Sequence, residues 1–442
     1  MSAQDRSVVG SSVVNRTPAE TRKIVEAGLR KRNNAERRFH SYGMLGVIVG
    51  IAFLFYFFAT IINDGTSAFV QTHVKLPVSF DADVIDPKGT NDPQVWAKAN
   101  YAKLIKNSLS ELFPDVKKRK EKKTLRQMVS AGAPFALADM VAADPSLIGE
   151  TVEIWLPTDD EVDMFNKGKI DRSVPEKRRR VKDNQIVWID QLNEQGRLQK
   201  QFNTTFFTAG DSRDPEMAGI LGAMKGSFFM LLVTIVIAFP LGVAAAIYLE
   251  EFAPRNRWID LLEVNINNLA AVPSIIYGLL GLSVFINFMN LPRSAPLVGG
   301  LVLALMTLPI IIIAGRSAIR AVPPSIREAA LGLGASDVQT VFHHVLPLAM
   351  PGLMTGAIIG MARALGETAP LLMIGMVAFI VEIPGTPFDP ATALPVQIYL
   401  WADSPERAFV ERTAAAIIVL LFFLLVMNGL AVWLRQRYER RW

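Results

Sequence analysis

The 442-residue sequence contains no cysteine and only four histidines. Without thiols the chain has no disulfide framework, no thiolate metal site and no cysteine nucleophile. The histidines, His40, His73, His343 and His344, do not have the spacing of a metal-ligand set. We therefore predict no metal site and no catalytic residue.

A phosphate-binding glycine loop is also missing. No G-x-x-x-x-G-K-[ST] string occurs, so the chain carries no P-loop for ATP. The net charge of +5 is modest and the basic residues are dispersed or lie beside apolar runs, so nucleic-acid binding is not needed to explain them. We interpret the chain as a non-enzyme, and any ATP-driven step requires hydrolysis on another subunit.

Long apolar blocks dominate the remaining sequence. Apolar residues make up 51% of the chain, which is typical of a multi-span membrane protein when they cluster in this way. The first block, 44–62, can span a hydrocarbon core of about 30 Å at about 1.5 Å per helical residue. Five further blocks occupy residues 219–248, 261–289, 296–314, 348–380 and 414–434. Several exceed the length of one span, and Pro240, Pro273 and Pro370 are the predicted break points.

Charge at the chain ends predicts the orientation. Residues 1–43 are polar and basic, with a helix expected over 18–38, and the tail 436–442 is basic as well. Six spans place both ends on one side, and the positive-inside rule makes that side the cytoplasm. We expect a multi-pass protein of the bacterial inner membrane.

Residues 63–217 contain no spanning run and predict a folded α+β domain outside the cytoplasm. Apolar spacing predicts a helix over 96–113, whereas 151–156 and 185–207 are interpreted as strands, with a possible hairpin turn at 195–196. The charged runs 117–123 and 177–180 are interpreted as solvated loops. No catalytic constellation stands out, so the role of this domain stays open.

The connection 316–347 has the composition of short helices. Ser325 is a candidate N-cap, with Glu328 at capping-box spacing, and Gly332 and Gly334 should weaken or end this first helix. A second helix through residue 345 would be capped by residue 336 or 337. Such a helix pair can dock into the groove of a partner, or it can form an amphipathic hairpin at the membrane surface.

The same connection resembles the EAA loop of ABC-importer permeases. In that family the loop forms a coupling helix that seats in a cleft of the ATPase subunit. His344 departs from the pattern, which prefers Ile there. The residues that match, and that the resemblance implies for ATPase coupling, are Glu328, Ala329, Ala330, Gly334, Leu346 and Pro347.

A narrower resemblance follows at residues 362–370, ARALGETAP, which are similar to a motif of the phosphate-specific permease subunits of the PstA type. Residues 272–274 and 321–323 fit that group too. The resemblance covers roughly 215–435, and the first two hundred residues resemble an extra N-terminal domain of unassigned function found in a subset of these permeases. It implies an all-α polytopic fold of the type I importer class, with six transmembrane helices and a core over 218–435.

The resemblance also implies partners. An importer of inorganic phosphate would need a second permease subunit of the PstC type, ATP-binding subunits of the PstB type and an extracytoplasmic phosphate-binding protein of the PstS type. No cofactor is expected on this chain, because ATP would be used by the partner subunit. Membrane lipid surrounds the spans, and no nucleic acid is expected.

Two charges lie inside the fifth apolar block. Arg363 and Glu367 are four residues apart and share a face if the helix continues. A charge at the bilayer centre costs at least about 2.5–3.5 kcal/mol, so it should face a partner or a water-filled path. Arg363 could contact a translocating oxyanion while Glu367 positions it, or the two could form an ion pair that only fixes packing.

Polar residues in the third block could line the same path. The candidates are Asn265, Asn267, Asn268 and Ser274, and they could equally make hydrogen bonds between helices. Two other functions remain open at this point. The substrate could be another oxyanion or a polar solute, or the chain could be a membrane-anchored sensor or scaffold that displays residues 63–217.

Overall fold

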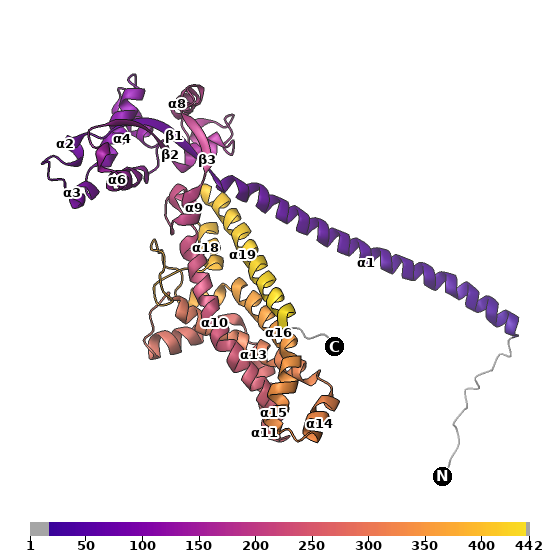
Figure 1. Cartoon of the computed structure of the whole chain (residues 1–442). Coiled ribbons are helices and arrows are strands. Elements are labelled where there is room, and N and C mark those ends of the chain that lie inside the picture. The colour runs from indigo at the N-terminus through magenta and orange to yellow at the C-terminus, as the bar shows by residue number, and fades with distance from the viewer. Residues whose placement is uncertain (1–16, 439–442) are drawn as a thin grey trace, which may run out of the picture. The chain divides into compact units, whose positions relative to one another are not determined.

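The computed structural model describes residues 17–438 (Figure 1), and these divide into two units at residues 60 and 61. Helix α1 (Pro18–Ala68) is one helix of 51 residues. The predicted helix over 18–38 is confirmed, and it continues into the apolar block because no proline interrupts the chain between them. Part of the predicted N-terminal segment, residues 1–16, and the tail beyond 438 lie outside the described residues.

A three-stranded antiparallel sheet organises the N-terminal domain. Strand β1 (Val70–Ser79) lies between β2 (Thr151–Pro157) and β3 (Leu198–Phe202), and His73 pairs with Pro157 on one side and with Gln199 on the other. Alternate residues of β1 are buried, as a half-buried strand requires.

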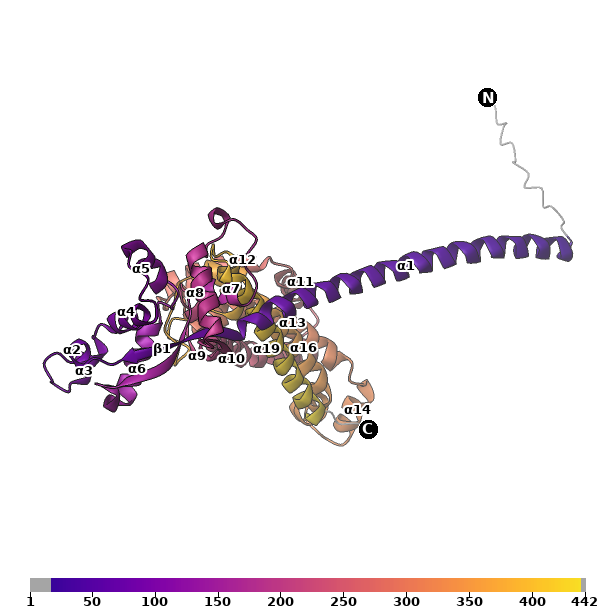
Figure 2. The same cartoon turned by 90° about the horizontal axis from the view of Figure 1, so that it is seen from above.

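Short helices complete the core of this domain. They are α2 (Ala82–Ile85), α3 (Pro93–Ala97), α4 (Tyr101–Leu112), α5 (Arg119–Arg126), α6 (Ala133–Ala143), α7 (Asp160–Asn166), α8 (Asp183–Glu194) and α9 (Thr204–Thr208). Figure 2 shows α4 and α6 beside β1. Their apolar residues join those of the sheet in one buried cluster. The predicted α+β character is confirmed.

Two local predictions in this domain are wrong. The segment predicted as strands over 185–207 begins with helix α8, because Trp188, Ile189 and Leu192 bury one helical face and the side chain of Gln185 accepts from the backbone N–H of Lys182 at 2.9 Å. The 195–196 turn therefore joins a helix to β3 rather than two strands. The charged run 117–123, predicted as a loop, enters helix α5, whose Thr124 and Leu125 are buried.

Long helices build the second half of the chain. Helix α10 (Leu221–Ile247) continues as a π-helical turn η4 (Tyr248–Phe252), and α13 (Pro296–Arg320) and α16 (Leu346–Gly366) lie beside it (Figure 1). Helix α19 (Ala408–Tyr438) packs against α16. Among residues 17–438, five helices are long and apolar enough to span a membrane, or six if one bent pair counts as a span. This agrees with the six predicted blocks. The predicted break at Pro240 is wrong, because α10 runs through it.

The bent pair is the third predicted block. Helix α11 (Arg257–Ala270) meets α12 (Ser274–Leu280) at an angle of 101°, and α12 continues as a π-helical segment η5 (Gly281–Phe288). The predicted break at Pro273 is confirmed. Proline cannot donate a backbone hydrogen bond and disfavours helical geometry in the residue before it, so α11 ends there.

The fifth predicted block also breaks. Helix α16 ends at Gly366, and the short α17 (Ala369–Met373), with Pro370 in its first turn, follows. Residues 374–393 are irregular and lead to α18 (Leu394–Ala402). A continuous span over 348–380 is therefore wrong beyond residue 366. The chain turns at Gly375, whose φ of 89° is left-handed.

Candidate translocation and coupling sites

Arg363 lies in the last turn of α16. Its Nε is 3.5 Å from Oε1 of Glu367, and no other acidic side chain within residues 17–438 lies within ion-pair distance of it. The predicted proximity of the two charges is confirmed, although Glu367 has left the helix, with φ −79° and ψ 123°. The Arg363 side chain is 45% exposed and that of Glu367 is 19% exposed. A guanidinium with one long contact retains donors that can face an anion.

The rotation of α16, and so the direction of Arg363, is set by close packing against α13. Modelling a Cβ on three glycines of α16 places each one 2.5 Å from a small side chain of α13. The pairs are Gly352 with Ala318, Gly356 with Ala314, and Gly360 with Thr307. Small residues at four-residue spacing allow two helices to approach in this way.

Ala364 is also fully buried, and Arg363 lies about 100° around the helix from it. The face of α16 that packs against α13 and the position of Arg363 therefore point in different directions. The three glycines were not predicted as a packing face, although their G-x-x-x-G spacing is visible in the sequence.

The helix break at 271–273 and the break at 367–368, which follows the turn that carries Arg363, lie side by side. A Cβ on Gly278 of α12 would lie 2.7 Å from Cα of Pro370, so α12 packs directly on the chain that follows α16. Tyr277, the buried neighbour of Gly278, donates its hydroxyl to the carbonyl of Leu269 at 2.7 Å. This bond holds α12 to α11 across the bend. The breaks at 271–273 and 367–368 therefore form one irregular region.

The predicted path residues of the third block flank the same bend. Asn268 is exposed in the last turn of α11, and Ser274 is the half-buried first residue of α12. The side chain of Asn265, by contrast, is used locally, donating to the carbonyl of Leu261 at 2.7 Å. A role for Asn268 and Ser274 in translocation stays a prediction.

The first coupling helix is α14 (Pro324–Gly332), with Glu328 and Ala329 exposed and Ala330 buried. The predicted N-cap at Ser325 is wrong, because the helix starts one residue earlier, at Pro324, where the fixed φ of proline suits the first turn. The predicted end is confirmed. Gly334 has φ 88° and donates to Leu331 at 2.9 Å.

The next residue completes a Schellman motif at this end. The N–H of Ala335 donates to the carbonyl of Ala330 at 3.1 Å, alongside the bond from Gly334. The motif fixes where α14 stops and turns the chain toward the second helix of the loop. Gly334 is thus placed by its backbone rather than by packing, since a Cβ on it would meet no atom within 4 Å.

The second coupling helix is continuous with the fifth span. Ser336 caps it with a capping box, accepting from the backbone N–H of Gln339 at 3.3 Å. From Asp337 the chain runs as one helix of 30 residues to Gly366, through α15 (Asp337–Thr340), a π-helical turn η6 (Val341–Val345) and α16. The predicted coupling residues Leu346 and Pro347 lie half-buried inside this helix. One rigid element therefore joins the loop to Arg363.

A cavity of about 730 Å³ opens between the two coupling helices. Leu333, which is 91% exposed, lines it together with Ala329 and Ala330 of α14, and His344 and Pro347 line the other side. His344, the residue that departs from the family pattern, is exposed in this cavity. Three of the matched residues, Ala329, Ala330 and Pro347, thus line one mostly apolar groove.

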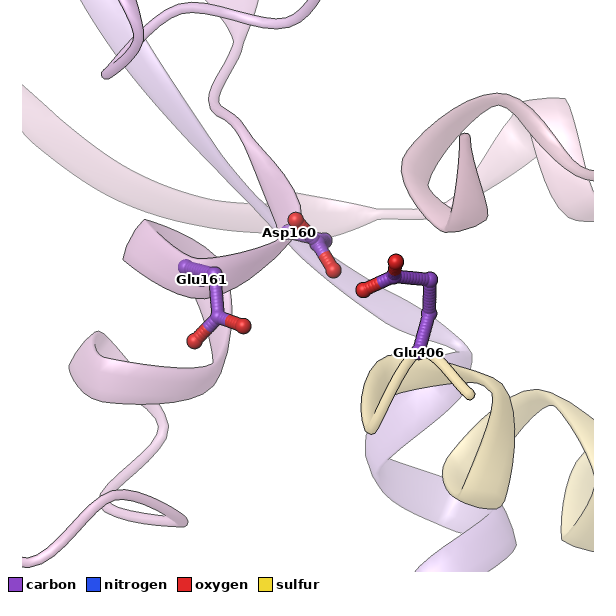
Figure 3. A group of neighbouring side chains, drawn as sticks. All are labelled: Asp160, Glu161 and Glu406. Carbon is purple, nitrogen blue, oxygen red and sulfur yellow. The ribbon is translucent and has the colours of Figure 1, made fainter. Parts of the chain in front are cut away.

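A separate cluster of carboxylates joins α7 to the residues before α19. Asp160, Glu161 and Glu406 place one oxygen each within 4.8 Å of one another (Figure 3). Arg180 donates to Glu161 at 3.2 Å and also binds Glu406, so a guanidinium already bridges two of the three. Burial raises the pKa of Asp160 and of Glu161. We assign no metal to this cluster, and the predicted absence of a metal site stays a prediction.

A helical bundle with two broken helices and an EAA-type loop defines the membrane subunit of an ABC importer. Residues 238–440 match the family described as binding-protein-dependent transport system inner membrane component, and residues 26–176 match a domain of unknown function.

Relatives with established names match over the same half of the chain. A probable ABC transporter permease protein, YqgI of Bacillus subtilis, is 32% identical over 53% of this chain and 83% of its own length. The phosphate transport system permease protein PstA 1 of Mycobacterium tuberculosis is 33% identical over 50% of this chain and 72% of its own length. Among solved structures, an inward-facing MetNI methionine ABC transporter shares 18% identity over 50% of this chain and 95% of that one, with a TM-score of 0.39.

The chain therefore belongs to the family of inner-membrane components of binding-protein-dependent transport systems. Within that family it is an ABC-importer permease of the PstA type, with an extra N-terminal domain. The predicted fold class, a polytopic helical permease with an inserted α+β domain, is confirmed. A sensor or scaffold whose helices serve only as anchors is no longer needed to explain the sequence.

Proposed function

We propose that this permease subunit imports inorganic phosphate. The observation that carries the proposal is Arg363, a half-exposed guanidinium at the end of α16 beside two helix breaks. A guanidinium stays protonated and offers a planar fork of donors that matches the oxygens of phosphate. The naming of several relatives as phosphate transport system permease proteins supports the same substrate.

Glu367 has a distinct part in this proposal. Its carboxylate is 3.5 Å from Nε of Arg363, close enough to hold the guanidinium and to compete with an anion for it. Conduction through a pathway requires binding that is weak enough to release the solute. Glu367 therefore positions Arg363 and limits how tightly phosphate binds, and Asn268 and Ser274 at the neighbouring bend supply neutral polar groups along the path.

The driving force comes from partner subunits in this proposal. An ATPase of the PstB type docks on the groove around α14, contacting Glu328, Ala329, Ala330 and Gly334 and the segment that contains Leu346 and Pro347. A second permease of the PstC type completes the pathway, and a binding protein of the PstS type delivers phosphate. Both chain ends and the coupling loop then face the cytoplasm, and residues 63–217 lie on the opposite side of the inner membrane.

Substitution of Arg363 tests the proposal in cells that depend on this chain for phosphate. We expect Arg363→Ala to abolish uptake, and Arg363→Lys to retain a fraction of it because a point charge replaces the fork. Arg293→Ala is the matched control, since Arg293 is an exposed arginine of the same core in the turn before α13. Co-purification of the other subunits must stay normal. Wild-type uptake in an assembled Arg363→Ala complex would contradict the proposal.

A further inference from the structure

Helix α10 ends in a π-helical turn that presents two adjacent carboxylates. The N–H of Ala253 donates to the carbonyl of Tyr248 at 2.8 Å and closes the turn. Glu250 and Glu251, inside it, are 15% and 11% exposed. Neighbouring residues on a helix point in different directions, so the two carboxylates reach different partners. π-helical turns of this kind occur often at functional positions.

Glu251 binds Arg327, the residue directly before the Glu-Ala-Ala of the EAA loop. Both of its oxygens lie 3.2 Å from Nε of Arg327, and Oε1 lies 2.5 Å from Nη2, which is a forked contact. The remaining donors of Arg327 reach the end of α13, with Nη1 2.7 Å from the carbonyl of Val322 and Nη2 3.0 Å from that of Ile319. One guanidinium therefore joins α14, α10 and α13.

Glu250 makes a parallel but different set of contacts. It accepts from Arg316 at 3.3 Å and from Arg320 at 2.8 and 3.0 Å, and both arginines belong to α13. Arg316 also donates to Glu263 of α11 at 2.6 Å. These bonds tie α10, α11 and α13 together and do not include α14. Of the two carboxylates, Glu251 is the one that reaches the coupling helix.

The other attachments of α14 include packing against η6 and α15 of the second coupling helix. The one buried residue of α14 is Ala330, and Ile326 packs at the edge of a cluster that contains Ala246 and Ile247 of α10. Most of its surface faces outward, as a docking helix requires. Besides the contact of Ile326, the charged pair directly attaches α14 to the end of α10, so a displacement of α14 by a partner can be passed through it.

We infer that the Arg327–Glu251 pair is the link that makes α10 move with α14 when the ATPase moves the coupling loop. The inference rests on the proposed ATP-driven function. Arg327 is a positioning residue in this account, since it acts through the helices and not on the solute. A pair that served only local stability would leave the transmission of motion unchanged when removed.

Transport and hydrolysis measured together in the reconstituted complex test the link. We expect Arg327→Gln and Glu251→Gln to keep the ATPase bound and hydrolysing. The amount of phosphate transported per ATP should fall roughly fivefold or more, which is the size of effect that coupling between two sites typically has. Arg320→Gln is the matched control, because Arg320 binds the adjacent Glu250 and is 67% exposed. An unchanged ratio in both test variants, or an equal fall in the control, would overturn the inference.

A distance measurement tests the link whatever the solute. The chain has no cysteine, so Tyr248→Cys in η4 at the end of α10 and Leu331→Cys on α14 provide two unique sites for spin labels. The two residues are 52% and 46% exposed. We expect the same distance distribution without nucleotide and with ATP when the native pair is present, and two different distributions in the Arg327→Gln background.

The inference would be overturned if ATP changed the distance between the two labels when the native pair is present. It would also be overturned if ATP left that distance unchanged in the Arg327→Gln background. If the complex moves a solute other than phosphate, or none, the proposed substrate fails while the distances still report on the link. Failure of the link with normal phosphate uptake leaves the proposed function intact. The two results are therefore separable.

Discussion

The ammonium group of Lys167, the residue that ends α7, lies 2.9 Å from Oε1 of Glu411 in the first turn of α19, and both side chains are 5% exposed. Asp163 contacts the same ammonium at 2.6 Å and accepts from the backbone N–H of Thr72 at 2.8 Å. The second oxygen of Glu411 accepts from Ser67 at 2.6 Å. This buried network fastens the N-terminal domain to a long helix of the core.

Removing the cation should destabilise the protein. We expect Lys167→Met to lower stability by roughly 3–5 kcal/mol, because two buried carboxylates lose their partner. The midpoint of thermal unfolding of the purified protein measures the effect. Lys169→Met is the control, since Lys169 pairs with Asp64 at 3.0 Å with both side chains about one-third exposed, where such pairs contribute less than about 1 kcal/mol. Equal losses in the two variants would show that the buried network is not the stronger attachment.

The N-terminal domain should be more stable at acidic pH than at alkaline pH. Burial, with the nearby Asp160 and Glu216, raises the pKa of Asp159 to about 8. Burial also raises the pKa of Glu216. The folded state then holds a proton that the unfolded state releases near its ordinary value of about 4.

Stability therefore falls as pH rises from about 4 to about 8 and levels off above it. Thermal unfolding followed at pH 5.5 and pH 8.5 checks the direction. Asp159→Asn should reduce the difference between the two midpoints, because an amide does not titrate. Asparagine should preserve the helix cap, since its side-chain oxygen can accept from the N–H of Glu161 as that of Asp159 does. The groups that share this environment are Asp160, Glu161, Glu216, Arg180 and Glu406. A higher midpoint at pH 8.5 in the native protein would contradict the prediction.

Gly334 should tolerate substitution less well than Gly332, although a Cβ meets no atom within 4 Å at either position. The difference is backbone geometry, because Gly334 has φ 88° and an alanine there costs about 1–2 kcal/mol. We expect Gly334→Ala to lower uptake severalfold and Gly332→Ala to leave it near normal. Gly334→Asn should lie between them, since asparagine adopts this conformation more readily. Equal uptake in all three would show that the loop end is not constrained.

The contact of α16 with α13 should not admit a methyl group. We expect Gly356→Ala to destabilise the core by about 1–3 kcal/mol, since its Cβ would lie 2.5 Å from that of Ala314. Gly366→Ala adds the same methyl group where no atom lies within 4 Å. Thermal unfolding in detergent compares them. A Gly356→Ala protein as stable as Gly366→Ala would mean that the two helices separate without cost.

Sequence patterns predicted those features that depend on neighbouring residues. Apolar runs located the long helices, Pro273 located a break, and the four-residue spacing of Arg363 and Glu367 predicted their proximity. The end of α14 was predicted from Gly332 and Gly334, and the helix does end at Gly332. Each signal lies within a few positions of the feature that it predicts.

Features that depend on tertiary contact were not predicted. Lys167 and Glu411 are 244 positions apart, and Arg327 and Glu251 are 76 apart, so no local pattern joins them. In residues 185–207, β-prone side chains suggested strands, but burial of Trp188 against the domain core favoured a helix. The break after α16 lies directly before Pro370, which was one of the predicted break points. The absence of a span beyond it was not predicted, because apolar residues continue past Glu367.

Phosphate uptake by the reconstituted complex tests the central claim most directly. The measurement is ATP-dependent entry of radiolabelled phosphate into proteoliposomes that contain this chain and its partner subunits, with and without an equal concentration of sulfate. The account predicts uptake that requires ATP, is lost with Arg363→Ala and is unaffected by sulfate. Equal inhibition by sulfate, or phosphate entry that persists without Arg363, would contradict it.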